Sequence, residues 1–317
     1  MTATMTALPL ELLRCPTCQS GVTGDEVLRC VGCGAGYPVL DSIPRMLDEH
    51  APGVAAKRRE AAGWAEIATD HGWYEPDDTV DAALPYVCRD LGWDDLSWRA
   101  SEHSFGFLLD VLRPGMEVLE VGAAKCWGSQ HVIPRGCEYV GTDILVDPKV
   151  GLGRGAFYEE RVGPFLRVQA DGESLPFAAE SFDVAYCVAT LHHALDLAAM
   201  VREMARVTRR GGWVMALNEG TRAVTASPDA PEQEEERRYG INEHVHTLYA
   251  YLWAFARAGL VVRRVESAEG YHYLSGRRAG RLLRLPVVGR VAATLYTQSF
   301  DGYQGATFVA RKLLPLR

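Results

Sequence analysis

The stretch VLEVGAAKCWGSQ, residues 118–130, decides the fold of this chain. Its first residues form a short apolar run that predicts a buried strand. Small residues follow from Gly122 to Ala124 and predict a tight turn, after which a helix begins. In such a unit, the backbone N–H groups at the helix N-terminus can approach a ligand. The stretch therefore predicts one strand–turn–helix unit of an α/β domain, with a ligand site at its turn.

Short apolar runs of the same kind recur along the chain, and most of them are bounded by Gly, Pro or Asp. Strands are predicted at Glu117–Val121, Tyr139–Thr142, Phe165–Ala170, Val184–Val188, Trp213–Leu217, Val261–Val265 and Gly305–Arg311. Helical spacing of apolar residues marks Leu195–Arg210, and Gly211–Gly212 is expected to end that helix. This alternation predicts a doubly wound, mostly parallel α/β sheet.

Polar residues follow several of these strands directly. Asp143 ends the second predicted strand, Asp171 follows the third, and His192 and His193 follow the fourth. The carboxyl ends of parallel strands meet at one edge of the sheet, where open α/β sheets bind their ligands. An acid such as Asp143 can accept hydrogen bonds from the ribose hydroxyls of a nucleotide-like cofactor.

These features together resemble the class I S-adenosylmethionine-dependent methyltransferases over about residues 100–220. The resemblance implies a seven-stranded Rossmann-like sheet. It also implies that Asp143 binds the ribose of S-adenosylmethionine, that Ile144 flanks the adenine and that Asp171 reads the adenine amino group. The strand end Glu120–Gly122 and the turn after it would face the methionine part. The full set of cofactor-binding residues implied is Glu120, Gly122, Ala124, Asp143, Ile144, Asp171, Gly172, Val188 and His193.

The turn after the first strand departs from the family pattern, which has glycine at three alternate positions. Gly122 is present, but Ala124 and Cys126 occupy the other two, and Trp127 adds bulk next to them. A dinucleotide-binding Rossmann protein is the alternative, but its G-x-G-x-x-G pattern is absent here. The interpretation therefore depends on the ordered set of strand-end motifs rather than on the turn.

The segment CPTCQSGVTGDEVLRCVGC, residues 15–33, carries two CxxC pairs: Cys15, Cys18, Cys30 and Cys33. Four thiolates form the tetrahedral ligand set of a closed, structural Zn²⁺ site. Surface disulfides or a redox pair are the alternative. Residues 9–47 resemble small zinc-ribbon proteins that partner and activate methyltransferases. The resemblance implies a docking module with a protein partner rather than a catalytic one.

The chain is divided into a zinc ribbon at 1–50, a helical Trp-rich cap at 51–100 and a methyltransferase domain at 101–317. Cap insertions are expected at about 220–250 and 270–300. Trp64, Trp73, Trp93 and Trp98 fall in the second region. They could cover a flat substrate, or they could pack helices onto the main domain.

Histidine is the side chain best suited to removing a proton near neutral pH. His244 is our candidate base, with His192 and His246 as further catalytic candidates and Glu243 or Asn218–Glu219 to orient the substrate. Each could equally be a hydrogen-bonded structural residue. The arginine-rich segment Gly276–Arg290 could contact phosphate or RNA, or it could be a solvated face.

The formal net charge of −8 disfavours a dominant role in binding nucleic acid. No apolar run reaches the roughly 18 residues of a membrane span, and the first residues do not resemble a signal peptide, so we expect a cytoplasmic chain. The predicted function is methyl transfer to an oxygen or nitrogen nucleophile of a small molecule. A zinc-finger methyltransferase of ribosomal or transfer RNA and a non-catalytic scaffold are the alternatives.

Overall fold

The computed structural model describes residues 9–266, 291 and 303–313. The arginine-rich segment and the cap expected at about 270–300 lie outside the described residues, apart from residue 291. The helices are α1 Val54–Asp70, α2 Asp78–Ala83, α3 Val87–Asp90, α4 Leu96–Val111, α5 Ser129–Val132, α6 Gly155–Val162, α7 Leu197–Val207, α8 Glu234–Arg238 and α9 Leu248–Arg257. None of these described helices is long and apolar enough to cross a bilayer.

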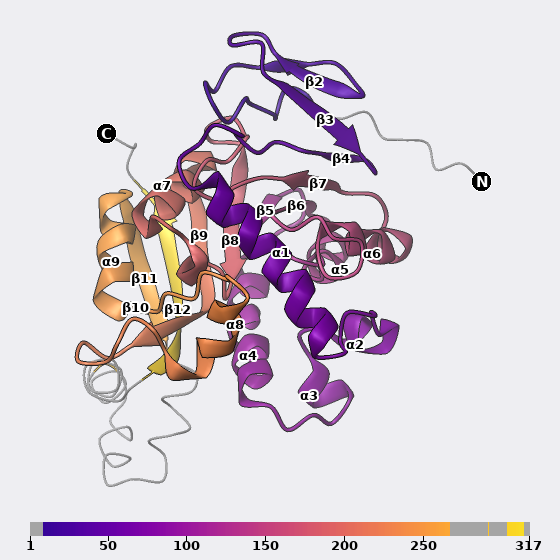
Figure 1. Ribbon diagram of the computed structural model, residues 1–317. Coiled ribbons are helices and arrows are strands. Elements are labelled where there is room, and N and C mark those ends of the chain that lie inside the picture. The colour runs from indigo at the N-terminus through magenta and orange to yellow at the C-terminus, as the bar shows by residue number, and fades with distance from the viewer. Residues whose placement is uncertain (1–8, 267–290, 292–302, 314–317) are drawn as a thin grey trace, which may run out of the picture.

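The central sheet has the spatial order β11-β12-β9-β8-β5-β6-β7 (Figure 1). Its strands are β5 Glu117–Val121, β6 Glu138–Asp143, β7 Leu166–Gln169, β8 Phe182–Val188, β9 Thr208–Arg222, β11 Leu260–Glu266 and β12 Tyr303–Lys312. In the run β7-β6-β5-β8-β9 each strand is parallel to its neighbours in the sheet. Strand β12 is antiparallel to both β9 and β11. All the predicted strands are present, and the α/β fold class is confirmed.

Strand side chains alternate between the two faces of the sheet, as the two-residue period requires. Leu119 and Val121 of β5 belong to the core that α7 and α9 cover. Val118 precedes Leu119 and points the opposite way, so it belongs to the core that α4 and α6 cover on the other face. The sheet therefore lies between two helical layers. Its strand order reverses between β5 and β8, because the chain runs outward from β5 to β7 on one side and from β8 to β9 on the other.

Helix α7 ends earlier than predicted. Asp196 caps it by accepting a hydrogen bond from the Ala199 N–H at 3.0 Å, and it stops at Val207. The expectation that it continues to Arg210 and is stopped by the glycines is wrong, because Thr208 already pairs with Phe182 of β8. The glycines instead lie inside β9, where Gly211 has a φ of +81° and the strand register shifts.

The cysteine-rich segment forms a small antiparallel sheet at the β7 edge of the central sheet (Figure 1). Its strands are β1 Val22–Thr23, β2 Val27–Cys30, β3 Gly36–Leu40 and β4 Ile43–Pro44. The Met46 N–H donates to the Gln169 carbonyl at 2.9 Å, and Leu13 forms an antiparallel bridge with Phe177. Leu13, Met46 and Phe177 are buried in one shared core. One face of this module is therefore occupied by the chain's own sheet, which also protects the otherwise open edge of β7.

Candidate functional site

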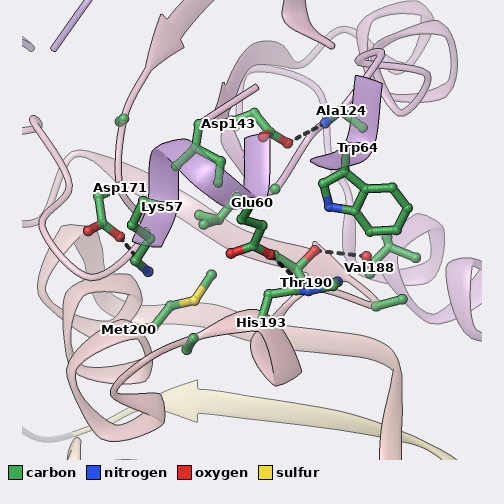
Figure 2. A pocket seen from close by; sticks show the side chains of 17 residues that line it. Lys57, Glu60, Trp64, Ala124, Asp143, Asp171, Val188, Thr190, His193 and Met200 are labelled. Atoms are coloured by element: carbon green, nitrogen blue, oxygen red, sulfur yellow. Dashed lines mark hydrogen bonds and ion pairs between the residues drawn. The ribbon is translucent and has the colours of Figure 1, made fainter. Parts of the chain in front are cut away.

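A cavity of about 190 Å³ lies where β5, β6, β7 and β8 end (Figure 2). The strand ends and the loops after them supply most of its wall, and α1 and α7 supply the rest. The lining residues are Lys57, Glu60, Trp64, Val121, Gly122, Ala124, Asp143, Ile144, Ala170, Asp171, Gly172, Val188, Ala189, Thr190, His193, Ala194 and Met200. Of the predicted cofactor-binding residues, all except Glu120 lie in this wall.

The turn after β5 keeps its glycine-like shape although two of its glycines are replaced. Gly122, Ala124 and Cys126 have φ angles of 71°, 43° and 64°, so all three lie in the left-handed region. A residue with a Cβ atom pays roughly 1–2 kcal/mol for that conformation. The Ala124 N–H donates to the Asp143 carboxylate at 2.7 Å, a contact that holds the strained turn against β6 (Figure 2).

The two bulky residues of this turn do not block the cavity. Cys126 is buried, belongs to the core shared with α4 and α6, and does not line the cavity. Trp127 packs its ring against Phe105 of α4, with the ring centroids 4.9 Å apart. The departure from the family pattern therefore costs backbone strain but leaves the space beside the turn open.

Asp143 and Asp171 present carboxylates to the cavity from neighbouring strand ends. Asp143 also accepts the Leu145 N–H at 2.8 Å, and burial raises the pKa of its carboxyl group. Asp171 is 3.1 Å from the ammonium group of Lys57. Lys57 also pairs with Glu173, so one cation of α1 is anchored by two acids from the loop after β7.

Helix α1 covers the cavity; the sequence left open whether its Trp64 covers a ligand, and Lys57 and Glu60 were missed. Lys57, Glu60 and Trp64 all line it, and their spacing of three and four residues places them on one helical face. That spacing, with Lys57 and Glu60 both buried, is the signal that could have found them. The tryptophans of the Trp-rich region differ in their surroundings. Trp64 lines the cavity, whereas the side chains of Trp73 and Trp93 are 42% and 41% exposed.

His193 lies in the cavity wall and is held from two sides. Its Nδ1 is 3.0 Å from the Glu60 carboxylate and 3.0 Å from the Asn242 carbonyl oxygen. Burial by itself would lower its pKa. The hydrogen bond to Glu60 and the charge of Glu243 outweigh burial and raise the pKa of His193 to about 9.

His192 does not line the cavity but contacts Glu219 beneath it. Its Nδ1 is 3.0 Å from the Glu219 carboxylate, which also accepts the Thr190 N–H at 3.0 Å. Burial opposes ionisation of Glu219, but the hydrogen bonds from His192 and from the backbone lower the pKa of this acid. Glu219 therefore positions the whole turn after β8, which includes cavity residues.

His244 and His246, the other two predicted catalytic histidines, also lie outside the cavity wall. His246 is in the short strand β10 (His246–Thr247), which pairs with Thr221 near the end of β9. Its ring packs against that of His244 with centroids 4.9 Å apart, and burial lowers the pKa of His246 to about 4. The pairing of β10 with β9 carries both side chains away from the strand ends that build the cavity. Among the predicted histidines, His193 is the one that reaches it.

Glu120 faces the opposite side of the sheet from the cavity. Its carboxylate accepts hydrogen bonds from the hydroxyl groups of Tyr139 and Tyr186, at 2.5 Å and 2.7 Å. Glu120 does not line the cavity, although Val121 does, because the two residues are adjacent in a strand and therefore point to opposite faces. Burial raises the pKa of the Glu120 carboxyl group to about 7.

The four cysteines of the N-terminal module converge. Their sulfur atoms all lie within 4.8 Å of one another. The Sγ atoms of Cys15 and Cys33 are 3.6 Å apart, and those of Cys18 and Cys30 are 3.4 Å apart. Zn–S bonds of about 2.3 Å in a tetrahedron require sulfur separations of about 3.8 Å. The arrangement is thus close to that of a four-thiolate zinc site.

Residues 119–216 match a protein family described as a methyltransferase domain. A sterol 24-C-methyltransferase of Gibberella zeae is 24% identical over 177 residues, which cover 54% of this chain and 44% of the relative. A demethylmenaquinone methyltransferase of Mycobacterium marinum is 34% identical over 120 residues, covering 37% of this chain and 46% of the relative. Phosphoethanolamine N-methyltransferase 2 of Haemonchus contortus, solved with S-adenosyl-L-methionine, has a TM-score of 0.51 at 14% identity and covers 79% of this chain and 60% of that chain.

Residues 119–216 therefore match a methyltransferase domain, and the sheet has the fold of the Haemonchus contortus methyltransferase. The matched segment runs from β5 into β9 and includes most of the strand ends that line the cavity. The chain spans less than half of the length of the sterol and demethylmenaquinone relatives. The cysteine-rich module lies outside the matched segment.

The buried carboxyl group of Glu120 generates a prediction about pH. Its pKa is about 7 in the folded protein against 4.5 as the ordinary value, so the folded state holds the proton more tightly. The free energy of unfolding of the wild type should therefore fall, relative to Glu120→Gln, as the pH rises from about 4.5 to 7, by about 3 kcal/mol. Urea unfolding across that range measures it. Glu138→Gln, at the exposed start of β6, is the control, and an identical pH profile for wild type and Glu120→Gln would contradict the assignment.

The strained turn generates a second prediction. Ala124→Gly should stabilise the protein by about 1 kcal/mol, because glycine adopts the left-handed conformation without the penalty of a Cβ atom. Ala123→Gly is the matched control, since Ala123 is buried, does not have a positive φ and should lose stability on substitution. Thermal unfolding measures both effects, as a higher melting temperature for Ala124→Gly and a lower one for Ala123→Gly. Equal destabilisation by the two substitutions would show that the turn is not strained at Ala124.

Proposed function

We propose that this chain transfers a methyl group from S-adenosylmethionine to an oxygen or nitrogen nucleophile of a small molecule. The observation that carries the proposal is the cavity at the strand ends, which collects Gly122, Asp143, Asp171 and His193 from separate strand ends. Ligands of open α/β sheets bind at this edge, next to the point where strand order reverses. The relatives named above support a small-molecule acceptor, because their names refer to a sterol, demethylmenaquinone and phosphoethanolamine.

The residues of the cavity fit the cofactor. Asp143 lies at the end of the second strand of the parallel set, where an acid can accept hydrogen bonds from ribose hydroxyls. Ile144 and Gly172 offer apolar and unobstructed surface for the adenine, and Asp171 offers an acceptor for its amino group. The turn at Gly122–Ala124 would approach the methionine part. When bound, S-adenosylmethionine supplies an electrophilic methyl group on a positively charged sulfonium.

The charges of the cavity suit a cationic cofactor. Glu60, Asp143 and Asp171 place carboxylates around the cavity, while the Lys57 ammonium group is paired with Asp171 and Glu173. Negative groups stabilise a sulfonium more strongly where water is excluded, because the local dielectric constant is low. Helix α1 covers the cavity and so provides that exclusion.

The acceptor must lose a proton as its lone pair forms the new bond to the methyl carbon and the carbon–sulfur bond breaks toward sulfur. Glu60 and His193 form the hydrogen-bonded pair in the cavity wall, with Oε1 and Nδ1 3.0 Å apart. We assign proton removal to the Glu60 carboxylate of this pair, which the hydrogen bond to His193 holds in place. Trp64 and Met200 line the cavity beside it and offer apolar surface to hold the acceptor in line, the positioning on which such a displacement depends.

The cofactor assignment is tested at Asp143. Asp143→Ala should weaken the binding of S-adenosylmethionine at least tenfold, because a hydrogen bond to a charged group contributes about 1.5–3 kcal/mol. Isothermal titration calorimetry measures the affinity. Glu138→Ala, at the opposite end of the same strand, should bind like the wild type. Unchanged affinity in Asp143→Ala would refute the ribose assignment, and a wild type that does not bind at millimolar cofactor would favour the scaffold alternative.

We also propose that Cys15, Cys18, Cys30 and Cys33 hold a structural Zn²⁺ ion. Four thiolates complete its tetrahedron and leave no open position for catalysis. The module is too small to build a sufficient core by itself, so metal binding would supply folding free energy. Its shared core with Phe177 then transmits that stability to the β7 edge.

Removal of the metal should therefore loosen the module and its contact with the sheet. After chelation, we expect cleavage by trypsin between residues 9 and 47 and a lower melting temperature of the whole chain. Cys18→Ser should reproduce both effects, whereas Cys88→Ser should not, because Cys88 lies outside the cysteine cluster. A chelated protein that keeps full protease resistance in this segment would contradict a structural metal.

A further inference from the structure

A second group of metal-binding side chains lies beside the cavity, in addition to the four cysteines. His192, His193 and Glu243 bring two imidazole nitrogens and a carboxylate oxygen within 4.8 Å of one another. Nε2 of His192 is 3.5 Å from one Glu243 oxygen, and Nε2 of His193 is 3.8 Å from the other. Metal–nitrogen and metal–oxygen bonds of about 2.0–2.2 Å require ligand separations of about 3.3–3.6 Å in a tetrahedron. The three side chains are therefore spaced for one shared ion.

The surroundings orient each side chain toward the same point. His192 directs Nδ1 to Glu219 and His193 directs Nδ1 to Glu60, both at 3.0 Å. With the Nδ1 proton donated to a carboxylate, the Nε2 lone pair of each ring is free to bind a metal. Metal-binding histidines almost always donate their other ring N–H to a carboxylate, a backbone carbonyl or water, which selects the tautomer and the ring orientation. The Gln233 side-chain amide donates to Glu243 at 2.6 Å and holds the third group in place.

The negative charge of the buried carboxylates around this cluster would be stabilised by a bound cation. Glu60, Glu219 and Glu243 are only 3%, 0% and 5% exposed, so three carboxylates are buried around two rings. The two rings have centroids 4.3 Å apart, and protonating both would place like charges in contact at low dielectric. The Lys57 ammonium group pairs with Asp171 and Glu173 instead. A divalent ion supplies two positive charges while both imidazoles stay neutral.

We propose that His192, His193 and Glu243 bind a divalent transition-metal ion at the border of the cavity. Two histidines and one carboxylate suit zinc and neighbouring first-row metals. Three protein ligands leave at least one coordination position for water or for an oxygen of a bound molecule. Because His193 also lines the cavity, that position would serve an oxygen-bearing acceptor. This last role rests on the proposed methyltransferase function, whereas the metal site itself does not.

Cobalt binding to the full chain tests the site, because Co²⁺ bound to thiolates shows sulfur charge-transfer absorption and Co²⁺ bound to nitrogen and oxygen does not. We expect two Co²⁺ ions per wild-type chain by equilibrium dialysis. Glu243→Gln and His192→Asn should each bind one, with the sulfur absorption intact. His246→Asn, which changes a neighbouring histidine outside the cluster, should still bind two. Glu219→Gln should weaken the second site about 10–100-fold without abolishing it, as expected for a positioning residue.

The wild type alone keeps the proposal falsifiable if the buried variants fail to fold. X-ray absorption of the cobalt-saturated wild type should show nitrogen or oxygen neighbours at about 2.0–2.2 Å in addition to sulfur at about 2.3 Å. Saturation at one Co²⁺ per chain with sulfur neighbours only would overturn the proposal, as would folded cluster variants that keep two ions. The measurements need no S-adenosylmethionine, so a failure of cofactor binding would leave their outcome unaffected.

Discussion

The carboxylate of Asp143 ties together the parts of the chain from which the cavity is built. One oxygen accepts the Ala124 N–H of the turn after β5, and the other accepts the Leu145 N–H of the loop after β6. The first contact helps to hold a strained turn in which Ala124 and Cys126 have positive φ angles. The acid that we propose to bind the cofactor ribose also holds the turn, so cofactor binding and local stability would share one group.

The N-terminal third of the chain supplies the helix that covers the cavity at the strand ends. The cysteine-rich module attaches to the edge of β7 through Met46 and Leu13, and α1 begins a few residues later at Val54. That attachment sets the starting point of the helix, whose Lys57 and Glu60 then pair with Asp171 and His193 over the cavity (Figures 1 and 2). A structural metal in the cysteine-rich module would in this way influence how α1 covers the cavity.

Three buried glutamates contact the two histidines that follow β8. Glu219 comes from the end of β9, Glu243 from the segment before β10 and Glu60 from α1, and all three converge on the adjacent His192 and His193. Unpaired buried carboxylates are costly, and each of these has at least one hydrogen-bonding partner. Such convergence from three separate elements is typical of a functional centre rather than of packing.

The strands, their parallel order and the residues at their ends could be read from the sequence, because apolar runs and turn residues are local signals. The positions of Asp143 and Asp171 follow from that pattern, and so does the pairing of four cysteines by their repeated spacing. The side of the sheet that Glu120 faces was also available from the two-residue period of a strand, but the family resemblance led to the other assignment. The end of α7 was misplaced because strand pairing with Phe182, a tertiary contact, competes with the glycine signal.

The sequence by itself therefore determined the sheet and its ligand-binding edge, since these depend on short segments and on the direction of the chain. Tertiary structure alone decided which distant groups meet there. Helix α1 lies over the strand ends, β10 draws His244 and His246 away from them, and Glu60, Glu219 and Glu243 gather around His192 and His193. The contact between Glu60 and His193 joins residues more than a hundred positions apart, and all of these contacts depend on packing between elements that no local pattern encodes.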